Sequence, residues 1–131
     1  MPYLVDTNIY IYARDGRYAV REKFVEHTGN ILLSAVSLAE LQRGLDAREP
    51  DAHLRAQRHG LLIERVAVVP FDAAAARAYA DVLRYSGRIK SRDIDHLIAA
   101  HALSLGVVLV TNNLADFAGI PDLVLENWAQ P

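Results

Sequence analysis

Four acidic side chains stand where an α/β enzyme would present groups to a ligand. They are Asp6, Glu40, Asp95 and Asp116. Asp6 directly follows the apolar segment 3–5, which is typical of a short buried strand. The other three follow later apolar segments or begin a helical pattern. Ligands of parallel α/β sheets bind beyond the carboxyl ends of the strands, so we expect these four carboxylates to share one edge of a sheet.

Gathering carboxylates in one place has an electrostatic cost that a bound cation removes. Two carboxylates about 5 Å apart repel each other by about 3 kcal/mol at an effective dielectric constant of ~20. A set of ligands made only of oxygen atoms suits Mg²⁺ or Mn²⁺. Such ions orient water and neutralise charge that develops on a phosphate oxygen. The set therefore predicts metal-assisted hydrolysis of a phosphodiester.

Three of these residues also have a purely structural explanation. Asp6 could cap a helix that begins at Thr7. Ser37 and Glu40 have the spacing of a capping box. Asp116 has the spacing of a first-turn residue behind Asn113. A carboxylate has two oxygens, so capping and ligand binding can coexist in one residue.

The most strongly helical segment contains two aspartates, and only one of them can face the site. Asp93 and Asp95 are two residues apart and therefore point about 200° apart on a helix. Asp95 shares a side with Ile98, Ala99 and Ala102, whose small side chains permit a close approach to the sheet. We therefore expect Asp95 to face the site and Asp93 to be the N-cap of its helix.

Short apolar strands alternate with helices along the whole chain, which predicts an α/β fold. The expected strands are 3–5, 31–33, 66–69, 107–110 and a marginal 123–125. The expected helices are 7–14, 17–27, 37–45, 51–64, 73–85, 93–105 and 113–117. No hairpin signal separates the strands, so we expect a central parallel sheet of about four to five strands covered by helices on both faces. Residues 1–131 are predicted to form a single domain.

The charge of the chain limits how it can meet nucleic acid. It has 131 residues, 14 Lys and Arg, and 16 Asp and Glu, for a formal net charge of -2. A broad surface that coats nucleic acid is therefore not expected, whereas a local basic patch is compatible with this balance. Basic residues flank Gly87 just before the acidic helix: Arg84, Arg88, Lys90 and Arg92. They either contact phosphates on the two sides of the scissile bond or form a solvated turn.

Several function classes lose their usual support. There is no cysteine, which excludes disulfides and thiolate metal sites and makes the cytoplasm the expected compartment. No apolar run approaches the roughly 18 residues of a membrane span, and we expect neither a membrane anchor nor a secretory signal. The sequence lacks the glycine-rich dinucleotide motif, the P-loop and the serine-hydrolase elbow.

Four motifs, taken together and in order, resemble a known family. They are Leu4-Val5-Asp6-Thr7-Asn8, Ser34-x-x-Ser37-x-x-Glu40-x-x-x-Gly44, Asp95-His96-Leu97-Ile98-Ala99-Ala100-His101-Ala102, and Leu109-Val110-Thr111-Asn112-Asn113-x-x-Asp116-Phe117. This pattern resembles PIN-domain ribonucleases and, among them, most closely the VapC toxins of toxin–antitoxin systems. The resemblance covers essentially the whole chain.

The resemblance implies a PIN-like three-layer α/β/α sandwich and an endoribonuclease that depends on Mg²⁺ or Mn²⁺ and cuts structured RNA, often tRNA or ribosomal RNA. By motif, Asp6 and Asp95 would be the main metal ligands, and Glu40 would bind the ion directly or through water. Asp116 would complete the site or hold a second ion. Thr7, Asn8, Thr111 and Asn113 would be supporting polar residues, with Thr111 orienting a carboxylate or water.

The resemblance also implies partners. Toxins of this kind form homodimers and are silenced by a cognate VapB antitoxin, whose tail covers the active-site groove and often presents an arginine to the carboxylates. Some family members have Asp at the position of Asn113, so Asp116 could be the sole source of the fourth ligand here.

Three other functions share some of these sequence features. A PIN-like module that binds RNA or protein without catalysis would be expected to have a broken acidic set, whereas all four positions are intact here. A phosphoacceptor receiver domain needs an acidic pair after its first strand and a late lysine, but only Asp6 follows that strand and no lysine follows Lys90. A DNA nuclease stays open, because metal chemistry at carboxylates does not itself select the sugar.

Overall fold

The structure is a computed structural model that describes residues 2–46 and 48–130; Met1, Ala47 and Pro131, which include both ends of the predicted domain, lie outside the described residues. Five parallel strands form one sheet in the order β3-β2-β1-β4-β5. They are β1 (Tyr3–Val5), β2 (Ile31–Ser34), β3 (Ala67–Val69), β4 (Val108–Val110) and β5 (Leu125–Glu126). The predicted parallel sheet is confirmed.

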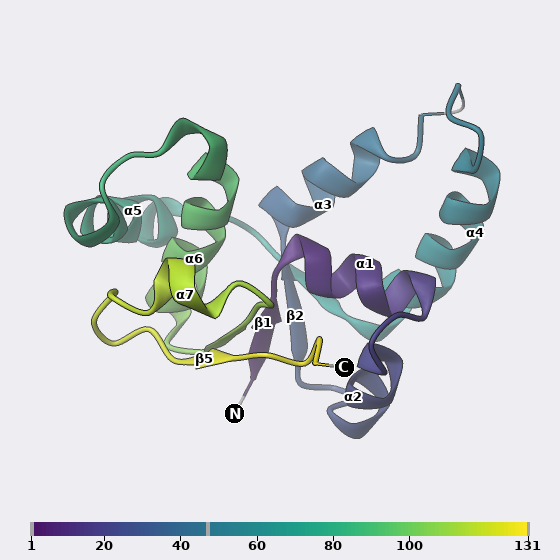
Figure 1. Ribbon diagram of the computed structural model, residues 1–131, viewed down its shortest axis with the longest axis horizontal. Helices are drawn as coiled ribbons and strands as arrows, with labels where there is room; N and C mark the ends of the chain where they lie inside the picture. Colours follow the sequence, from purple (N-terminus) through teal and green to yellow (C-terminus); the bar gives the residue numbers. More distant parts are fainter. Residues whose placement is uncertain (1, 47, 131) are drawn as a thin grey trace.

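Helices cover both faces of this sheet. They are α1 (Thr7–Asp15), α2 (Val20–Glu26), α3 (Ala35–Arg43), α4 (Ala52–Leu62), α5 (Ala73–Ser86), α6 (Asp93–Leu105) and α7 (Leu114–Phe117), with short 3₁₀ turns at η1 (Ile63–Arg65) and η2 (Lys90–Arg92). Figure 1 shows α1 to α4 on one side of the central strands and α5, α6 and α7 on the other. The predicted three-layer α/β/α sandwich is therefore confirmed.

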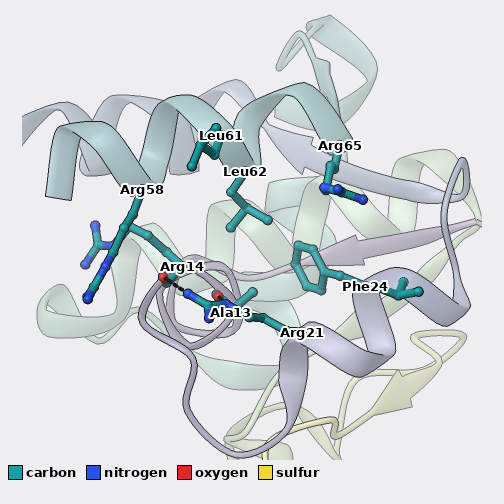
Figure 2. Close-up of a pocket in the computed structure, with 9 residues that line it drawn as sticks. Ala13, Arg14, Arg21, Phe24, Arg58, Leu61, Leu62 and Arg65 are labelled. Atoms are coloured by element: carbon teal, nitrogen blue, oxygen red, sulfur yellow. Dashed lines mark hydrogen bonds between the residues drawn. The ribbon is translucent and has the colours of Figure 1, made fainter. Parts of the chain in front are cut away.

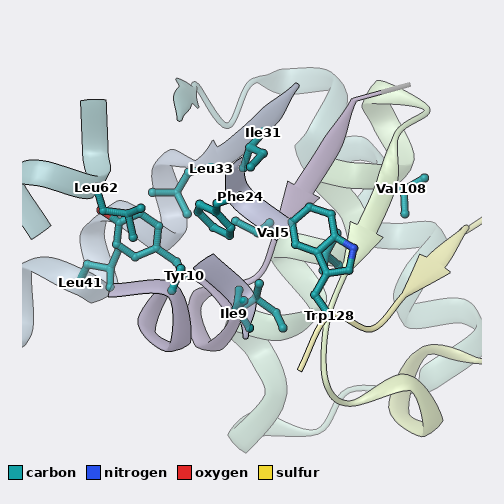
Figure 3. Packing of buried hydrophobic residues seen from close by; sticks show 13 residues of the cluster. Val5, Ile9, Tyr10, Phe24, Ile31, Leu33, Leu41, Leu62, Val108 and Trp128 are labelled. Carbon is teal, nitrogen blue, oxygen red and sulfur yellow. The ribbon is translucent and has the colours of Figure 1, made fainter. Parts of the chain in front are cut away.

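The alternation of side chains along each strand produces two separate cores. Val5, Leu33 and Val110 point to the face covered by α1 to α4, where Tyr10 and Phe24 pack against them (Figure 3). The neighbouring residues along the same strands, including Leu4 and Leu109, point to the opposite face and meet α5, α6 and α7. Central parallel strands are apolar on both faces because helices bury both of them.

The strand order creates a switch point beside β1. The chain runs from β1 outward to β2 and β3, then returns to place β4 on the other side of β1. The backbone N–H of Asp6 donates to the carbonyl oxygen of Val110 at 2.9 Å, so the carboxyl ends of β1 and β4 lie side by side. Ligands of doubly wound sheets bind at such a point. Receiver domains have the order β2-β1-β3-β4-β5, so this order rules out that alternative.

The structure corrects two predictions about where elements begin. Helix α3 begins at Ala35 rather than Ser37, because the Ser34 hydroxyl accepts a hydrogen bond from the Val36 N–H at 3.1 Å and caps the helix. The capping box that the spacing of Ser37 and Glu40 would allow is therefore not formed, because Ser34 is the N-cap. Asp93 is the first residue of α6 rather than its N-cap, and its side-chain oxygens bond Tyr79 and Arg88.

Positive backbone angles shift two further elements. Tyr18 and Ala19 have φ values of 59° and 58°, so α2 begins at Val20 instead of residue 17. Asp122 has a φ of 66°, and the fifth strand forms only from Leu125, where it pairs with Leu109. Within residues 2–46 and 48–130, none of the helices has the length and apolar character needed to cross a membrane.

Candidate active site

Asp6 directly follows β1 and is the N-cap residue of α1. Its Oδ1 accepts a hydrogen bond from the Ile9 N–H at 2.9 Å, which is the geometry of an N-cap. The side chain of Thr111, at the end of β4, also hydrogen-bonds to this carboxylate. Only 8% of Asp6 is exposed, and it lines a cavity of about 140 Å³. Asp6 therefore caps a helix and faces the site at the same time.

Glu40 reaches the site from α3. The Thr7 hydroxyl donates to Glu40 Oε1 at 2.5 Å and lies 3.0 Å from the Ser37 hydroxyl. These contacts tie the first turn of α1 to the middle of α3. Glu40 does not cap α3, because Ser34 is the N-cap. Its hydrogen bond from Thr7 instead holds its carboxylate at the rim of the site.

Asp95 connects two neighbouring cavities. It lines the cavity of about 140 Å³ together with Asp6, and it also lines a groove of about 450 Å³ together with Glu40. Asp93 is directed elsewhere: Arg88 Nη2 lies 2.9 Å from Asp93 Oδ2, and the Tyr79 hydroxyl donates to Oδ1 at 3.3 Å. Asp95 therefore lines both cavities, whereas Asp93 lines neither of them.

The carboxylates act on one another electrostatically. Burial raises the pKa of Asp6, the hydrogen bonds from Thr111 and Ile9 lower it, and the charges of Asp95 and Glu40 raise it; together they bring this pKa to about 6. Burial also raises the pKa of Asp95, and the charges of Glu40 and Asp116 add to that effect. Groups that shift each other's pKa in this way form one cluster, and perturbed carboxylates in a cleft are typical of functional sites.

Both carboxylate oxygens of Asp116 contact neighbouring side chains. Arg92 Nη1 lies 3.0 Å from Asp116 Oδ1, and the Asn113 side-chain amide donates to Oδ2. The backbone N–H of Asn113 donates to the Thr111 hydroxyl at 3.1 Å. Asn113 occupies the N-cap position of α7, but its side chain makes no capping bond to that helix. Asp116 thus borders the cluster while its oxygens accept bonds from protein groups.

The predicted phosphate-binding residues are largely engaged with carboxylates. Arg84 pairs with Asp81 at 3.2 Å, Arg88 pairs with Asp93, and Arg92 pairs with Asp116. Lys90 is exposed in η2. Of the four, Arg92 alone is paired with a carboxylate of the acidic set.

Two arginines that sequence reasoning missed line the larger groove. They are Arg14 of α1 and Arg55 of α4. No local motif marks either residue. Arg55 in particular reaches this groove only because α4 packs against α1. Asn8 and Thr7, which the family motif did single out, line the groove as well.

The chemistry of the side chains suits a divalent cation. Among the described residues, no three His, Asp or Glu side chains are grouped closely enough to surround one ion by themselves. Mg²⁺ usually takes only one or two carboxylates and keeps several waters. The pair Asp6 and Asp95, which share a cavity of about 140 Å³ lined mostly by polar atoms, fits that mode of binding.

A second groove of about 380 Å³ lies between α1, α2 and α4 (Figure 2). Phe24 and Leu62 form its apolar floor, and Leu61 stands at its edge with 70% of its surface exposed. Four arginines surround it: Arg14, Arg21, Arg58 and Arg65. Arg14 lines both this groove and the groove that contains Glu40 and Asp95.

Comparison with known proteins shows to which family the chain belongs. Residues 3–122 match the PIN domain. Ribonuclease VapC2 of Rickettsia felis is 32% identical over 134 residues, covering 98% of this chain and 98% of that protein. The tRNA(fMet)-specific endonuclease VapC of Shigella flexneri is 32% identical over 133 residues, covering 98% of this chain and 99% of that protein.

Solved structures agree with the sequence relatives. The VapBC2 complex of Rickettsia felis bound to a promoter DNA fragment matches with a TM-score of 0.84 and 31% identity, covering 98% of this chain and 99% of that chain. The DNA-bound VapBC complex of Salmonella typhimurium matches with a TM-score of 0.84 and 28% identity over 98% of both chains. This chain belongs to the PIN domain family and, within it, to the VapC ribonuclease toxins.

Proposed function

We propose that this chain is an endoribonuclease that depends on Mg²⁺ or Mn²⁺, cuts phosphodiester bonds in structured RNA and is inhibited by a VapB-type antitoxin. Two neighbouring cavities carry the proposal: Asp6 and Asp95 line one, Glu40 and Asp95 line the other, and the pKa of Asp6 is raised to about 6. The cost of keeping these charges together is explained if a cation offsets it.

Each residue of the chain has a distinct part in this scheme. Asp6 and Asp95 would hold the ion, with Thr111 keeping the Asp6 carboxylate in place. Glu40 accepts from Thr7 on Oε1 and offers Oε2 to the ion or to a water on it. A bound divalent cation would supply the positive charge that orients water and offsets charge developing on the phosphate. Asp116 would complete the site or hold a second ion once Arg92 and Asn113 release its oxygens.

The proposed substrate is tRNA or ribosomal RNA. Two relatives with about one third identity, from Shigella flexneri and Salmonella typhimurium, are named tRNA(fMet)-specific endonucleases. RNA also agrees with the family to which the chain belongs. Carboxylates and a cation do not distinguish ribose from deoxyribose, so DNA belongs in the assay as a comparison substrate. The proposed compartment is the cytoplasm, where such RNAs occur.

The proposed partners are a VapB-type antitoxin and a second copy of this chain. The groove shown in Figure 2 suits an antitoxin segment, because Leu61 and Val25 are 70% and 66% exposed beside an apolar floor. Its four arginines would favour acidic residues on that segment. The shared Arg14 places this groove next to the active-site groove, so one extended partner could cover both.

The reading as an inactive PIN-like binding module has less support. A module without catalysis has no need for a buried carboxylate whose pKa is raised by its neighbours, and such a group lowers the stability of the ionised fold. The alternative would regain weight only if the protein bound RNA and left it intact.

A cleavage assay tests the proposed function. Purified protein is incubated with total tRNA, or with a DNA of matched sequence, in EDTA and then after addition of Mg²⁺ or Mn²⁺. We expect discrete RNA fragments only after the metal is added, and intact RNA with Asp6→Asn purified in parallel. Cleavage that is equal in EDTA, or that persists in Asp6→Asn, would contradict the proposal, as would intact RNA in both metals.

A further inference from the structure

We propose that Arg55 of α4 binds a phosphate of the RNA strand beside the acidic cluster and so positions the strand along the active-site groove. This inference rests on the proposed ribonuclease function and adds a substrate-binding residue that neither the motifs nor the family match identifies. The observation behind it is the position of the Arg55 guanidinium in the same groove as Glu40 and Asp95, held by a neutral group and not by a carboxylate.

The groove joins two regions of opposite charge. It has a volume of about 450 Å³ and is lined by carboxylates of α3 and α6 and by arginines of α1 and α4. Arg55 Nη1 donates to the Gly44 carbonyl oxygen at 2.8 Å, which holds the guanidinium over the end of α3. A phosphate near Glu40 and Asp95 needs a cation, whereas a phosphate further along the groove meets Arg55.

Arg55 differs from the arginines near the site that form ion pairs with carboxylates. Arg14 is buried and bonds both oxygens of Asp15, at 3.0 and 3.3 Å. Arg88 and Arg92 pair with Asp93 and Asp116. Across residues 2–46 and 48–130, no carboxylate lies within ion-pair distance of Arg55. Its positive charge is therefore available to a ligand.

The carbonyl anchor restricts the guanidinium without neutralising it. A guanidinium has five N–H donors in a fixed plane, and the Gly44 carbonyl uses one. The remaining donors can bind two oxygens of one phosphate, a geometry that lysine cannot reproduce. Because Arg55 is already ordered by its anchor, less side-chain entropy is lost when the phosphate binds.

The first measurement is the steady-state cleavage of total tRNA at several salt concentrations. We expect Arg55→Ala to raise KM about tenfold, as for loss of a hydrogen-bonded charge, and to change kcat less than about twofold. We expect the slope of log KM against log salt to fall by about 0.7, the contribution of one phosphate contact in a single strand. Arg55→Lys should keep the salt slope, because it keeps the charge, while recovering only part of the affinity.

Arg77→Ala is the matched control. Arg77 is exposed on α5, which Figure 1 places on the other side of the molecule from α4, and it lines none of the grooves described above. Its removal changes the net charge equally and should leave KM and the salt slope unchanged. A purely structural role of Arg55, as a fastener of the Gly44 loop, would lower Tm but leave the salt slope unchanged. That result would overturn the inference.

A binding measurement keeps this test separate from the test of the proposed function. Fluorescence anisotropy of a labelled oligouridylate in EDTA reports the same salt slope without any cleavage. A lower slope for Arg55→Ala than for Arg77→Ala supports the phosphate contact even if the chain proves inactive toward tRNA. Equal slopes in the two variants overturn it even if the wild-type protein cleaves tRNA as proposed.

Discussion

The surroundings of Asp6 have opposing effects on the negative charge of its carboxylate. The first turn of α1 and the Thr111 side chain stabilise its negative charge through hydrogen bonds. Burial and the nearby charges of Asp95 and Glu40 oppose that charge more strongly, which is why the pKa rises to about 6. A residue that served only as an N-cap would gain nothing from this environment. The strain in its ionised state is explained by a ligand that needs the charge.

Replacement of Asp6 by Asn should therefore stabilise the metal-free fold near neutral pH. Asn is an equally good N-cap, so the bond to Ile9 can persist. The unfolded Asp6 ionises near 3.8 and the folded one near 6, so wild-type stability falls between these pH values and stays lower above them. The variant should be more stable than wild type by up to about 3 kcal/mol at pH 7 in EDTA.

Urea unfolding at pH 4 and pH 7 measures this difference. The two proteins should differ little at pH 4 and clearly at pH 7, and Mg²⁺ should stabilise only the wild type. A variant that is less stable than wild type at pH 7 would show that the Asp6 charge contributes favourably to the metal-free fold.

Helix α3 illustrates how one element positions a functional side chain. The Ser34 hydroxyl accepts from the Val36 N–H and lies 2.9 Å from His101 Nδ1, so it can donate its single proton to the imidazole. Burial lowers the pKa of His101, which keeps this ring neutral and able to accept. Ser34 thus fixes the start of α3 and joins it to α6, and these two helices carry Glu40 and Asp95.

Substitution of Ser34 by Ala tests that connection. The change removes a helix cap and leaves His101 Nδ1 without its partner in a buried environment. We expect a loss of about 2 kcal/mol in the free energy of unfolding, measured in urea. Ser104→Ala removes a hydroxyl from the same helix α6, where it bonds only the His101 carbonyl, and should cost much less. Equal stability of the two variants would contradict the role assigned to Ser34.

The predictable parts of the structure are those with a local signal. Helical periodicity separates Asp95 from Asp93, and the strand-end position singles out Asp6; the structure has Asp6 and Asp95 lining one cavity. Helix α3 begins two residues earlier than predicted because the Ser34 hydroxyl caps the Val36 N–H. The second bond of Ser34, to His101, joins residues 67 positions apart and has no local signal. The engagement of Arg92 with Asp116 and the position of Arg55 depend on loops and helices that meet only in the folded chain. No periodic pattern encodes such contacts.

At the scale of the molecule, two adjacent grooves would serve the proposed catalysis and the proposed inhibition. The polar groove holds Glu40, Asp95 and Arg55, and the apolar groove of Figure 2 holds Phe24 and Leu62. Helix α1 contributes Arg14 to both. An antitoxin bound in the apolar groove would therefore lie against the substrate path, which is an arrangement suited to inhibition.

Leu61→Lys should separate inhibition from catalysis. Leu61 is 70% exposed, so the fold tolerates the change, but the partner segment loses an apolar contact. We expect the affinity for the cognate antitoxin to fall at least about tenfold, measured by calorimetry. Cleavage of tRNA should continue in the presence of antitoxin. Leu105→Lys, at a 43% exposed position of α6 outside both grooves, is the control, and equal affinities of the two variants would contradict the proposed surface.

The most direct test of the account compares Asp95→Asn with Asp93→Asn. The two substitutions remove the same charge from the same helix two residues apart, but only Asp95 borders Asp6 and Glu40, whereas Asp93 pairs with Arg88. Measurement of kcat/KM for RNA cleavage in Mg²⁺ should show a loss of about a hundredfold or more for Asp95→Asn and a change of less than about threefold for Asp93→Asn. Equal activity of the two variants, with both folded, would contradict the claim that the clustered carboxylates perform the reaction.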